Sequence, residues 1–364
     1  MEWKLHRYYA DSLYEVLSYV ETISNKYKDR DGIAPLWFRG HEYTYYNLAP
    51  NIFRGAKYIY NDQKTYSNNH LREQYRYQHF MARNFDKPDY REPRSVFEWQ
   101  EIMQHFFSKT RLMDWSESLF SGLEFALEAF FIPYNDLEIS RRRHSMQPVL
   151  WILQPNMLND QVYDSLLEDD FNLLNSVLRD VDLTTRDIIG NGLKDHKDIY
   201  FSSKERGERN YEGIVSLTAL EDLRRSYVAR EDAALKNGEL NPFFYVLLRI
   251  YSDGIPVNWG TVPPLAIIHP YHSQRIKSQK GVFTVSPHYI PSQYVRGVQK
   301  LNVRFNPMAM EYMPKCQNCL HEIRLINPQK IAEQMREIGF KSSDLYPDSQ
   351  RTAQDMENMD FSLS

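Results

Sequence analysis

The stretch "LWFRGHEYTYYNLAPNIFR", residues 36–54, decides how this chain is organised. Its first three residues are apolar or aromatic, which predicts a buried β-strand. The strand then reaches Arg39 and Gly40. A guanidinium at a strand end offers a planar donor fork that suits a phosphate or a carboxylate. A glycine lets another group approach the backbone closely. Two interpretations of Arg39 stay open here: it binds a ligand phosphate, or it pairs with a buried carboxylate.

Composition indicates an ordinary globular protein. The chain has 364 residues, of which 42% are hydrophobic and 25% charged, so it is long enough for one large domain or two. A net charge of −4 argues against dedicated binding of duplex DNA, because such proteins usually carry a strong basic excess. No signal-peptide core and no apolar stretch of membrane-spanning length are present in the sequence. We therefore expect a cytoplasmic protein that does not bind membranes.

The two cysteines, Cys316 and Cys319, form a Cys-x-x-Cys pair that is followed by His321. A single pair does not support a disulfide framework. It also leaves a structural zinc site one ligand short, because such sites normally take four. We expect two thiols in a surface turn and no metal cofactor.

Hydrophobic periodicity predicts an α+β fold. Helices are predicted over residues 11–29, 71–85, 95–107, 119–131 and 329–340. Strands are predicted over residues 147–155, 263–270, 281–287 and 320–328, in addition to the one that begins at residue 36. The long stretch 156–245 reads as mostly helical and polar, with a surface loop at 194–209. One domain with a small mixed sheet and many surrounding helices is therefore expected.

The segment 110–116 carries candidate functional side chains. In an extended conformation Thr110, Leu112 and Asp114 share one face, and Arg111 lies on the other. Asp114 is a candidate general base or a partner for Arg39. Trp115 either stacks on a ligand ring or fills the core. His105, at the end of the preceding predicted helix, is a second acid–base candidate.

A further polar group lies near residue 280. Arg275 and Gln279 are four residues apart on a predicted helix and so face the same way, and Gly281 opens the next strand. Several well-known motifs are absent from the sequence: the phosphate-binding Gly-x-x-x-x-Gly-Lys loop, Gly-x-Gly-x-x-Gly, His-Glu-x-x-His and Gly-x-Ser-x-Gly. Their absence argues against a P-loop NTPase, a kinase, a Rossmann dehydrogenase, a zincin and an α/β hydrolase.

The order of these motifs resembles the FRG domain family, which is named for its Phe-Arg-Gly motif. The family's central block usually reads Gln-His-Tyr-Gly-Leu-Pro-Thr-Arg-Leu-Leu-Asp-Trp-Thr. The residues that match it here are Gln104, His105, Thr110, Arg111, Leu112, Asp114 and Trp115. The chain departs at residues 107–109, where Gly-Leu-Pro is usual. The resemblance spans about residues 35–350, with 156–245 least matched; residues 1–34 would be an N-terminal helical extension and 351–364 a C-terminal tail.

A weaker resemblance is to arginine-dependent ADP-ribosyltransferases. Arg39-Gly40 resembles their first strand, and residues 110–116 with the following helix resemble their second element. This resemblance implies a split β-sheet of ADP-ribosyltransferase type and NAD as a substrate. Gln279 then falls where those enzymes carry a catalytic glutamate. Glutamine supplies a hydrogen bond but no negative charge, so catalysis at a glycosidic carbon would be weakened.

Three functional hypotheses follow. The first, implied by the resemblances, is an ADP-ribosyltransferase-like enzyme that uses NAD or a related nucleotide. Association with the family further implies that it is the effector of a bacterial stress or phage-defence system. Its expected catalytic residues are Asp114, His105 and Gln279. Its expected ligand-binding residues are Arg39, Gly40, Thr110, Arg111, Trp115, Ser116 and Arg275. The second hypothesis, favoured by Gln279, is a non-catalytic module that binds a nucleotide or a protein partner. The third is a hydrolase or nuclease that uses His105 and Asp114.

Distant polar groups that converge on one concavity usually mark a site. We therefore expect five of these residues to surround a single pocket: Arg39, His105, Arg111, Asp114 and Gln279.

Overall fold

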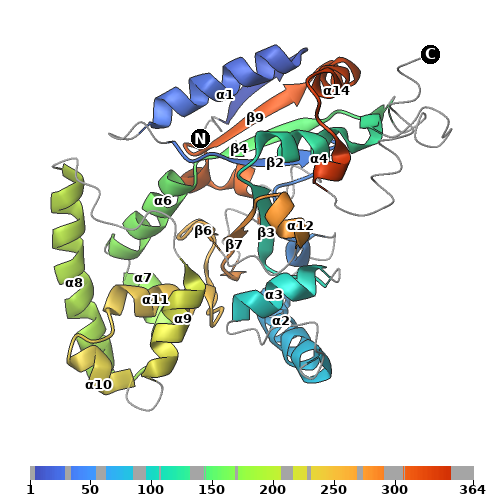
Figure 1. The fold of residues 1–364 in the computed structure, drawn as a ribbon. Helices are drawn as coiled ribbons and strands as arrows, with labels where there is room; N and C mark the ends of the chain where they lie inside the picture. Colours follow the sequence, from blue (N-terminus) through green and yellow to red (C-terminus); the bar gives the residue numbers. More distant parts are fainter. Residues whose placement is uncertain are drawn as a thin grey trace.

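The computed structural model describes residues 5–28, 34–54, 63–84, 96–105, 108–131, 143, 145–168, 171–205, 216–227, 231–268, 274–290, 306 and 308–345. Within this part of the chain the fold is α+β, as predicted, with helices on both sides of a mixed sheet (Figure 1).

The sheet of the described residues has seven strands in the order β1-β9-β4-β2-β3-β7-β6. Their bounds are β1 His6–Ala10, β2 Trp37–His41, β3 Leu112–Ser116, β4 Val149–Leu153, β6 Leu265–Ile267, β7 Gly281–Val285 and β9 Leu320–Leu325. β1 is parallel to β9 and the other neighbours are antiparallel. A separate parallel pair joins β5 (Val257–Asn258) to β8 (Tyr289–Ile290).

The helices lie in two groups. Those around the sheet are α1 Leu13–Tyr27, α4 Leu119–Phe131, α6 Pro155–Leu167, α12 Gln274–Ser278 and α14 Pro328–Glu337. The others are α2 Gln63–Asn84, α3 Val96–His105, α7 Phe171–Val177, α8 Leu183–Glu205, α9 Leu217–Ser226, α10 Glu231–Lys236 and α11 Pro242–Tyr251. Short 3₁₀ helices are η1 Asn51–Phe53, η4 Met310–Tyr312, η5 Pro314–Cys316 and η6 Ser342–Asp344.

Two sequence expectations about these elements are corrected. Residues 194–205 are not a surface loop but the second half of α8, and 206–209 lie outside the described residues. The first 34 residues are not only helical, because β1 pairs with β9 through five residue pairs and so joins the sheet. The tail 351–364 also lies outside the described residues.

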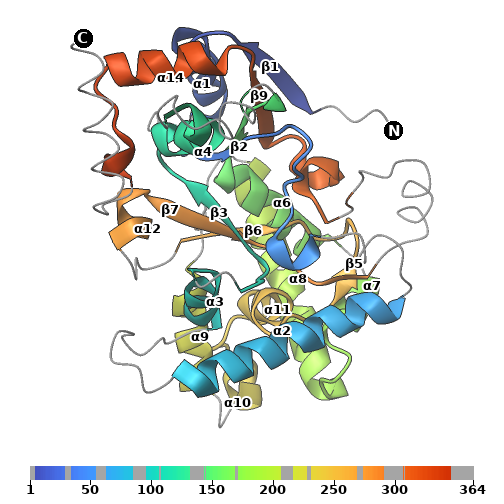
Figure 2. The same ribbon diagram turned by 90° about the vertical axis from the view of Figure 1, so that its right-hand side faces the viewer.

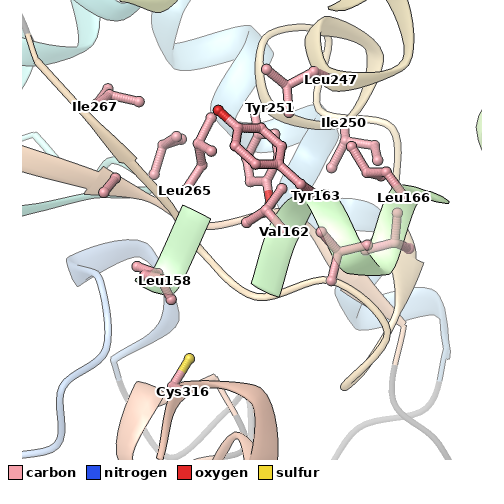
Figure 3. Close-up of a cluster of buried hydrophobic side chains, with 14 of the residues drawn as sticks. Leu158, Val162, Tyr163, Leu166, Leu247, Ile250, Tyr251, Leu265, Ile267 and Cys316 are labelled. Atoms are coloured by element: carbon pink, nitrogen blue, oxygen red, sulfur yellow. The ribbon is translucent and has the colours of Figure 1, made fainter. Parts of the chain in front are cut away.

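Separate apolar cores cover the two faces of the sheet. On one face α1, α4 and α14 pack through Val16, Leu127 and Ile331, which are fully buried. Figure 2 shows these three helices together at the top of the view, beside β1, β9 and β2. On the other face α6 and α11 meet β6. Figure 3 shows this second core, where Val162, Leu247 and Leu265 gather around Tyr251.

The cysteines belong to the second core rather than to a surface turn, which corrects the expectation. Cys316 and Cys319 are fully buried and unoxidised, and Cys316 lies beside α6 in Figure 3. Burial raises the pKa of Cys316 well above its ordinary value and that of Cys319 to about 12. Both therefore behave as small apolar side chains. Among the described helices none combines the length and apolarity needed to cross a bilayer.

The strands β2 and β3 diverge. Each forms five residue pairs with its other neighbour, β4 or β7. Between β2 and β3, only Phe38 and Ser116 pair within the described chain. The sheet is therefore joined at one end of these strands and open at the other.

Candidate functional site

A cavity of about 480 Å³ lies where β2 and β3 separate. Its walls come from β2, β3, β7, α3, α4, α12 and the segments that follow β2 and α12. The lining residues are Phe38, Arg39, Gly40, His41, Glu42, Tyr46, Glu101, Gln104, Asp114, Trp115, Phe125, Glu128, Ile276, Gln279, Gly281, Val282 and Phe283. The lining combines aromatic and aliphatic side chains with a few charged or polar groups, as is typical of a small-molecule site.

Arg39 spans the opening between the two strands. Its Nη1 donates to the main-chain oxygen of Asp114 at 2.5 Å and lies 3.8 Å from Oδ2 of the same residue. Its Nε donates to His41 Nε2 at 3.0 Å. The guanidinium thus satisfies a carbonyl that the diverging strand leaves without a ladder partner.

One part of Arg39 stays available for a ligand. Its Nη2 makes no hydrogen bond to any described residue, and the side chain is 17% exposed. Burial lowers the pKa of Arg39 to about 10, against the opposing effect of Asp114, so the group remains a cation at neutral pH. Arg39 thus pairs with a carboxylate, but Asp114 is half-exposed rather than buried, and the binding of a ligand phosphate by Arg39 stays a prediction.

His41 is neutral and orients Arg39. Burial, the Arg39 guanidinium and then Arg54 hold the pKa of His41 well below its ordinary value. Its Nε2 accepts from Arg39, so its Nδ1 carries the proton and donates to the Tyr46 carbonyl at 3.2 Å. No role for His41 was predicted from the sequence.

A chain of hydrogen bonds fixes Asp114. The Thr110 hydroxyl donates to Gln104 Oε1, and Gln104 Nε2 donates to Asp114 Oδ1, both at 2.6 Å. Thr110 is buried and lies outside the cavity, so it positions Gln104 rather than meeting a ligand. Asp114 itself is 56% exposed and lines the cavity, on the face of β3 that its alternation predicts.

Glu101 is a cavity residue that the sequence analysis missed. It extends from α3 and is almost fully buried. Burial, with the nearby Glu98 and Asp114 carboxylates, raises the pKa of Glu101 to about 8. The signal was present, since Glu101 lies four residues after the buried Phe97 and so on the inward face of the helix. A carboxyl that is protonated at neutral pH, beside one that pairs with a cation, is a pattern of acid–base sites.

Gln279 lines the cavity, and Ser116 holds the Gln279 main chain from outside it. The Ser116 hydroxyl donates to the Gln279 carbonyl at 2.6 Å and accepts from Ser118 N at 2.9 Å. The buried Ser116 therefore links β3 to the turn after α12 through this hydrogen bond, and it does not line the cavity. The Gln279 side chain does line it, and its Nε2 donates to the Leu345 carbonyl at 3.4 Å.

Arg111 does not lie in this cavity, which corrects the expectation of a pocket containing it. It points to the opposite side of β3, where it is almost fully buried against Glu73 at 2.6 Å. His288 contacts the same carboxylate at 2.8 Å. Burial tends to raise the pKa of Glu73, but Arg111 and His288 outweigh that effect and lower it to about 2. This cluster ties α2 to β3 and is structural.

The close packing of β2 against α4 requires a glycine at position 40. A Cβ at Gly40 would lie 2.1 Å from the Gly122 carbonyl and 2.3 Å from Ala126 N, in the backbone of α4. Conversely, a Cβ at Gly122 would lie 2.7 Å from Phe38 Cβ. The close approach expected at Gly40 is thus to α4, which forms one wall of the cavity.

The remaining predicted site residues divide into two cases. Trp115 belongs to the core, donates to Thr284 Oγ1 at 3.1 Å, and is one of the residues that line the cavity. His105 ends α3 and Arg275 lies in α12, but their side chains are outside what the structure describes. Of the five residues expected to converge, the cavity therefore brings together Arg39, Asp114 and Gln279.

Residues 34–131 match the FRG domain, so the chain contains an FRG domain. This range covers β2, α3, β3 and α4, and hence most of the cavity wall. The wider extent of 35–350 stays a prediction. No match was found among curated proteins or among solved structures. Within the described chain no group of three His, Cys, Asp or Glu side chains is arranged to hold a metal ion.

Proposed function

We propose that this chain is a cytoplasmic enzyme of ADP-ribosyltransferase type, which binds NAD or a related nucleotide in the cavity between β2 and β3. One observation carries the proposal. Arg39, Gln104, Asp114 and Gln279 come from segments up to 240 residues apart, yet they line one cavity at the place where the sheet opens.

The cavity offers suitable groups for each part of such a ligand. Arg39 Nη2 is a charge-assisted donor for a phosphate oxygen. Phe283, which pairs with Asp114 across β3 and β7, offers an apolar ring for a planar group. Cleavage of the bond to nicotinamide develops positive charge on the ribose, which a carboxylate stabilises. Asp114, held in place by Gln104, supplies the negative charge that Gln279 lacks.

Glu101 is the acid–base candidate of the proposed reaction. With a pKa of about 8 it is protonated at neutral pH and takes up a proton from an attacking hydroxyl or water only once ionised. The proposed activity therefore increases as pH rises toward 8. We also propose that the enzyme acts in bacterial stress or phage defence, on the basis of family association alone.

Calorimetric titration with NAD tests the binding step. Arg39→Ala is expected to weaken NAD binding about ten- to a hundred-fold, because charge-assisted hydrogen bonds contribute about 1.5–3 kcal/mol. Arg39→Lys should not restore the affinity, because lysine loses the planar fork. Asp114→Asn should retain binding and abolish release of nicotinamide. A melting curve for each variant shows whether it is folded; unchanged NAD affinity in folded Arg39→Ala would rule the proposal out.

A second candidate function is a non-catalytic module that binds the nucleotide without cleaving it. The observation in its favour is Gln279, whose amide is engaged with the Leu345 carbonyl and carries no charge. The same titration separates the two functions. Binding of NAD with no release of nicotinamide by the wild-type protein would support the module.

A further inference from the structure

The four-residue turn that follows β2, Tyr43–Tyr46, carries three tyrosines whose rings contact one another. The ring centroids of Tyr43 and Tyr45 are 4.9 Å apart, those of Tyr43 and Tyr46 are 5.2 Å apart, and those of Tyr45 and Tyr46 are 5.0 Å apart. Tyr45 and Tyr46 are 52% and 46% exposed. Because large aromatic side chains are mostly used for packing, an exposed group of them indicates a contact surface.

The turn is held rigidly. Tyr46 N donates to the Tyr43 carbonyl at 3.1 Å, which closes a β-turn. The Thr44 hydroxyl donates to Gln147 Oε1 at 3.1 Å, and Tyr43 forms a parallel bridge with the same residue. The rings are thus ordered before any ligand binds, which reduces the entropy lost on binding.

The turn is also continuous with the cavity. Tyr46 lines it, and the Tyr46 carbonyl accepts from His41, which in turn accepts from Arg39. Arg39 donates on its other side to Asp114. The guanidinium therefore lies between Asp114 and the tyrosine turn. Arg54 is a second cation close enough to lower the pKa of His41.

We infer that the tyrosine turn is a stacking platform for a purine base, so that the cavity binds an adenine nucleotide rather than a sugar phosphate or a free phosphate. This inference rests on the proposed function and names the ligand class of the same site. The adenine stacks on the Tyr46 ring, which lines the cavity and which the Tyr45 ring contacts edge-on at 79°. The phosphates meet Arg39, and the ribosyl group to be cleaved meets Asp114. Every base has a π-face, so the rings alone recognise the base as a planar group.

Calorimetric titration with AMP and with ribose 5-phosphate tests this inference, because these probes share the phosphate and differ in the base. The double variant Tyr45→Ala/Tyr46→Ala is expected to lose about 5- to 150-fold in affinity for AMP, which corresponds to about 1–3 kcal/mol for a stacked base. Its affinity for ribose 5-phosphate should not change. Tyr45→Phe/Tyr46→Phe keeps the rings and should bind AMP as the wild type does. Tyr14→Ala, an exposed tyrosine on α1, is the matched control.

The outcomes separate the inference from the proposed function. AMP and NAD affinities that are unchanged in the double alanine variant would overturn the stacking platform and leave NAD binding intact. An equal loss for AMP and ribose 5-phosphate, in a variant with an unchanged melting curve, would also overturn it. A wild-type protein that binds neither NAD nor AMP would overturn the proposed function, and the inference with it.

Discussion

At the scale of single residues, Arg39 and Arg111 differ in how deeply their carboxylate partners are buried. The Glu73 side chain is 5% exposed, whereas that of Asp114 is 56% exposed. Arg111→Ala leaves Glu73 charged in the interior, which typically costs about 3–5 kcal/mol of folding free energy. Arg39→Ala leaves Asp114 in contact with solvent and should cost about 1 kcal/mol. Urea denaturation of both variants measures the difference, and equal losses would contradict these assignments.

Glu101 should make stability depend on pH. Its pKa is raised from 4.5 to about 8 in the folded protein, so the folded state binds more protons than the unfolded state between these values. Stability therefore falls as pH rises through this window. Glu101→Gln removes the part of this loss of stability that Glu101 causes. That part is about 1.4 kcal/mol for each unit by which the pKa of Glu101 differs between the folded and unfolded states. The stability of the variant should still fall somewhat with pH, because the pKa of Glu311 is also about 8.

Melting temperatures of the wild type and Glu101→Gln between pH 5 and pH 9 test this prediction. The variant is expected to be more stable at pH 9, and the difference should shrink toward pH 5. Parallel curves would show that Glu101 does not titrate in this range.

The sequence predicted part of this site for physical reasons. Arg39, Asp114 and Gln279 are polar residues placed against apolar strands and a turn, which is an unusual pattern and therefore visible. Arg111 shows the same pattern, and only the side of β3 on which its partner Glu73 lies decides its role. That partner comes from a helix 38 residues away, so no local pattern distinguishes the two arginines.

At the scale of elements, the contact between β2 and α4 fixes one wall of the cavity. Gly40→Ala would place a Cβ within 2.3 Å of two α4 backbone atoms, which must move apart. Overpacking usually costs about 1–3 kcal/mol, and a backbone clash should reach the upper part of this range or exceed it. Gly190→Ala in α8 is the matched control, because nothing lies within 4 Å of its Cβ.

The control should gain about 0.5–1 kcal/mol, as alanine is the better helix former. Thermal unfolding of both variants provides the measurement. A fully stable Gly40→Ala protein would mean that β2 and α4 do not touch as described.

The elements also show where prediction from sequence stops. The strongly periodic helices α1, α4 and α14 were predicted close to their observed bounds. The strand β1 was missed, because "HRYYA" has no apolar alternation and its partner β9 lies 315 residues away. The charged half of α8 was predicted as a loop, since only its packing on α11, where the His196 ring stacks on Phe243, shows that it is part of the helix.

At the scale of the whole molecule, the two thiols report global unfolding. Cys316 and Cys319 are fully buried in the core shared by α6 and α11. A thiol reagent reacts with the thiolate, which burial disfavours here. We expect no labelling of the native protein, and labelling of both thiols in urea with the midpoint that circular dichroism gives. Rapid labelling without denaturant would show that this core opens locally.

The central claim is that the opening between β2 and β3 binds NAD, and a crystal structure of the protein with NAD tests it most directly. We expect the ligand in the cavity, with a phosphate oxygen in hydrogen-bond contact with Arg39 Nη2 and the nicotinamide ribose beside Asp114. Density for NAD at another place, with the Arg39–Asp114 contact and the cavity unchanged, would contradict it.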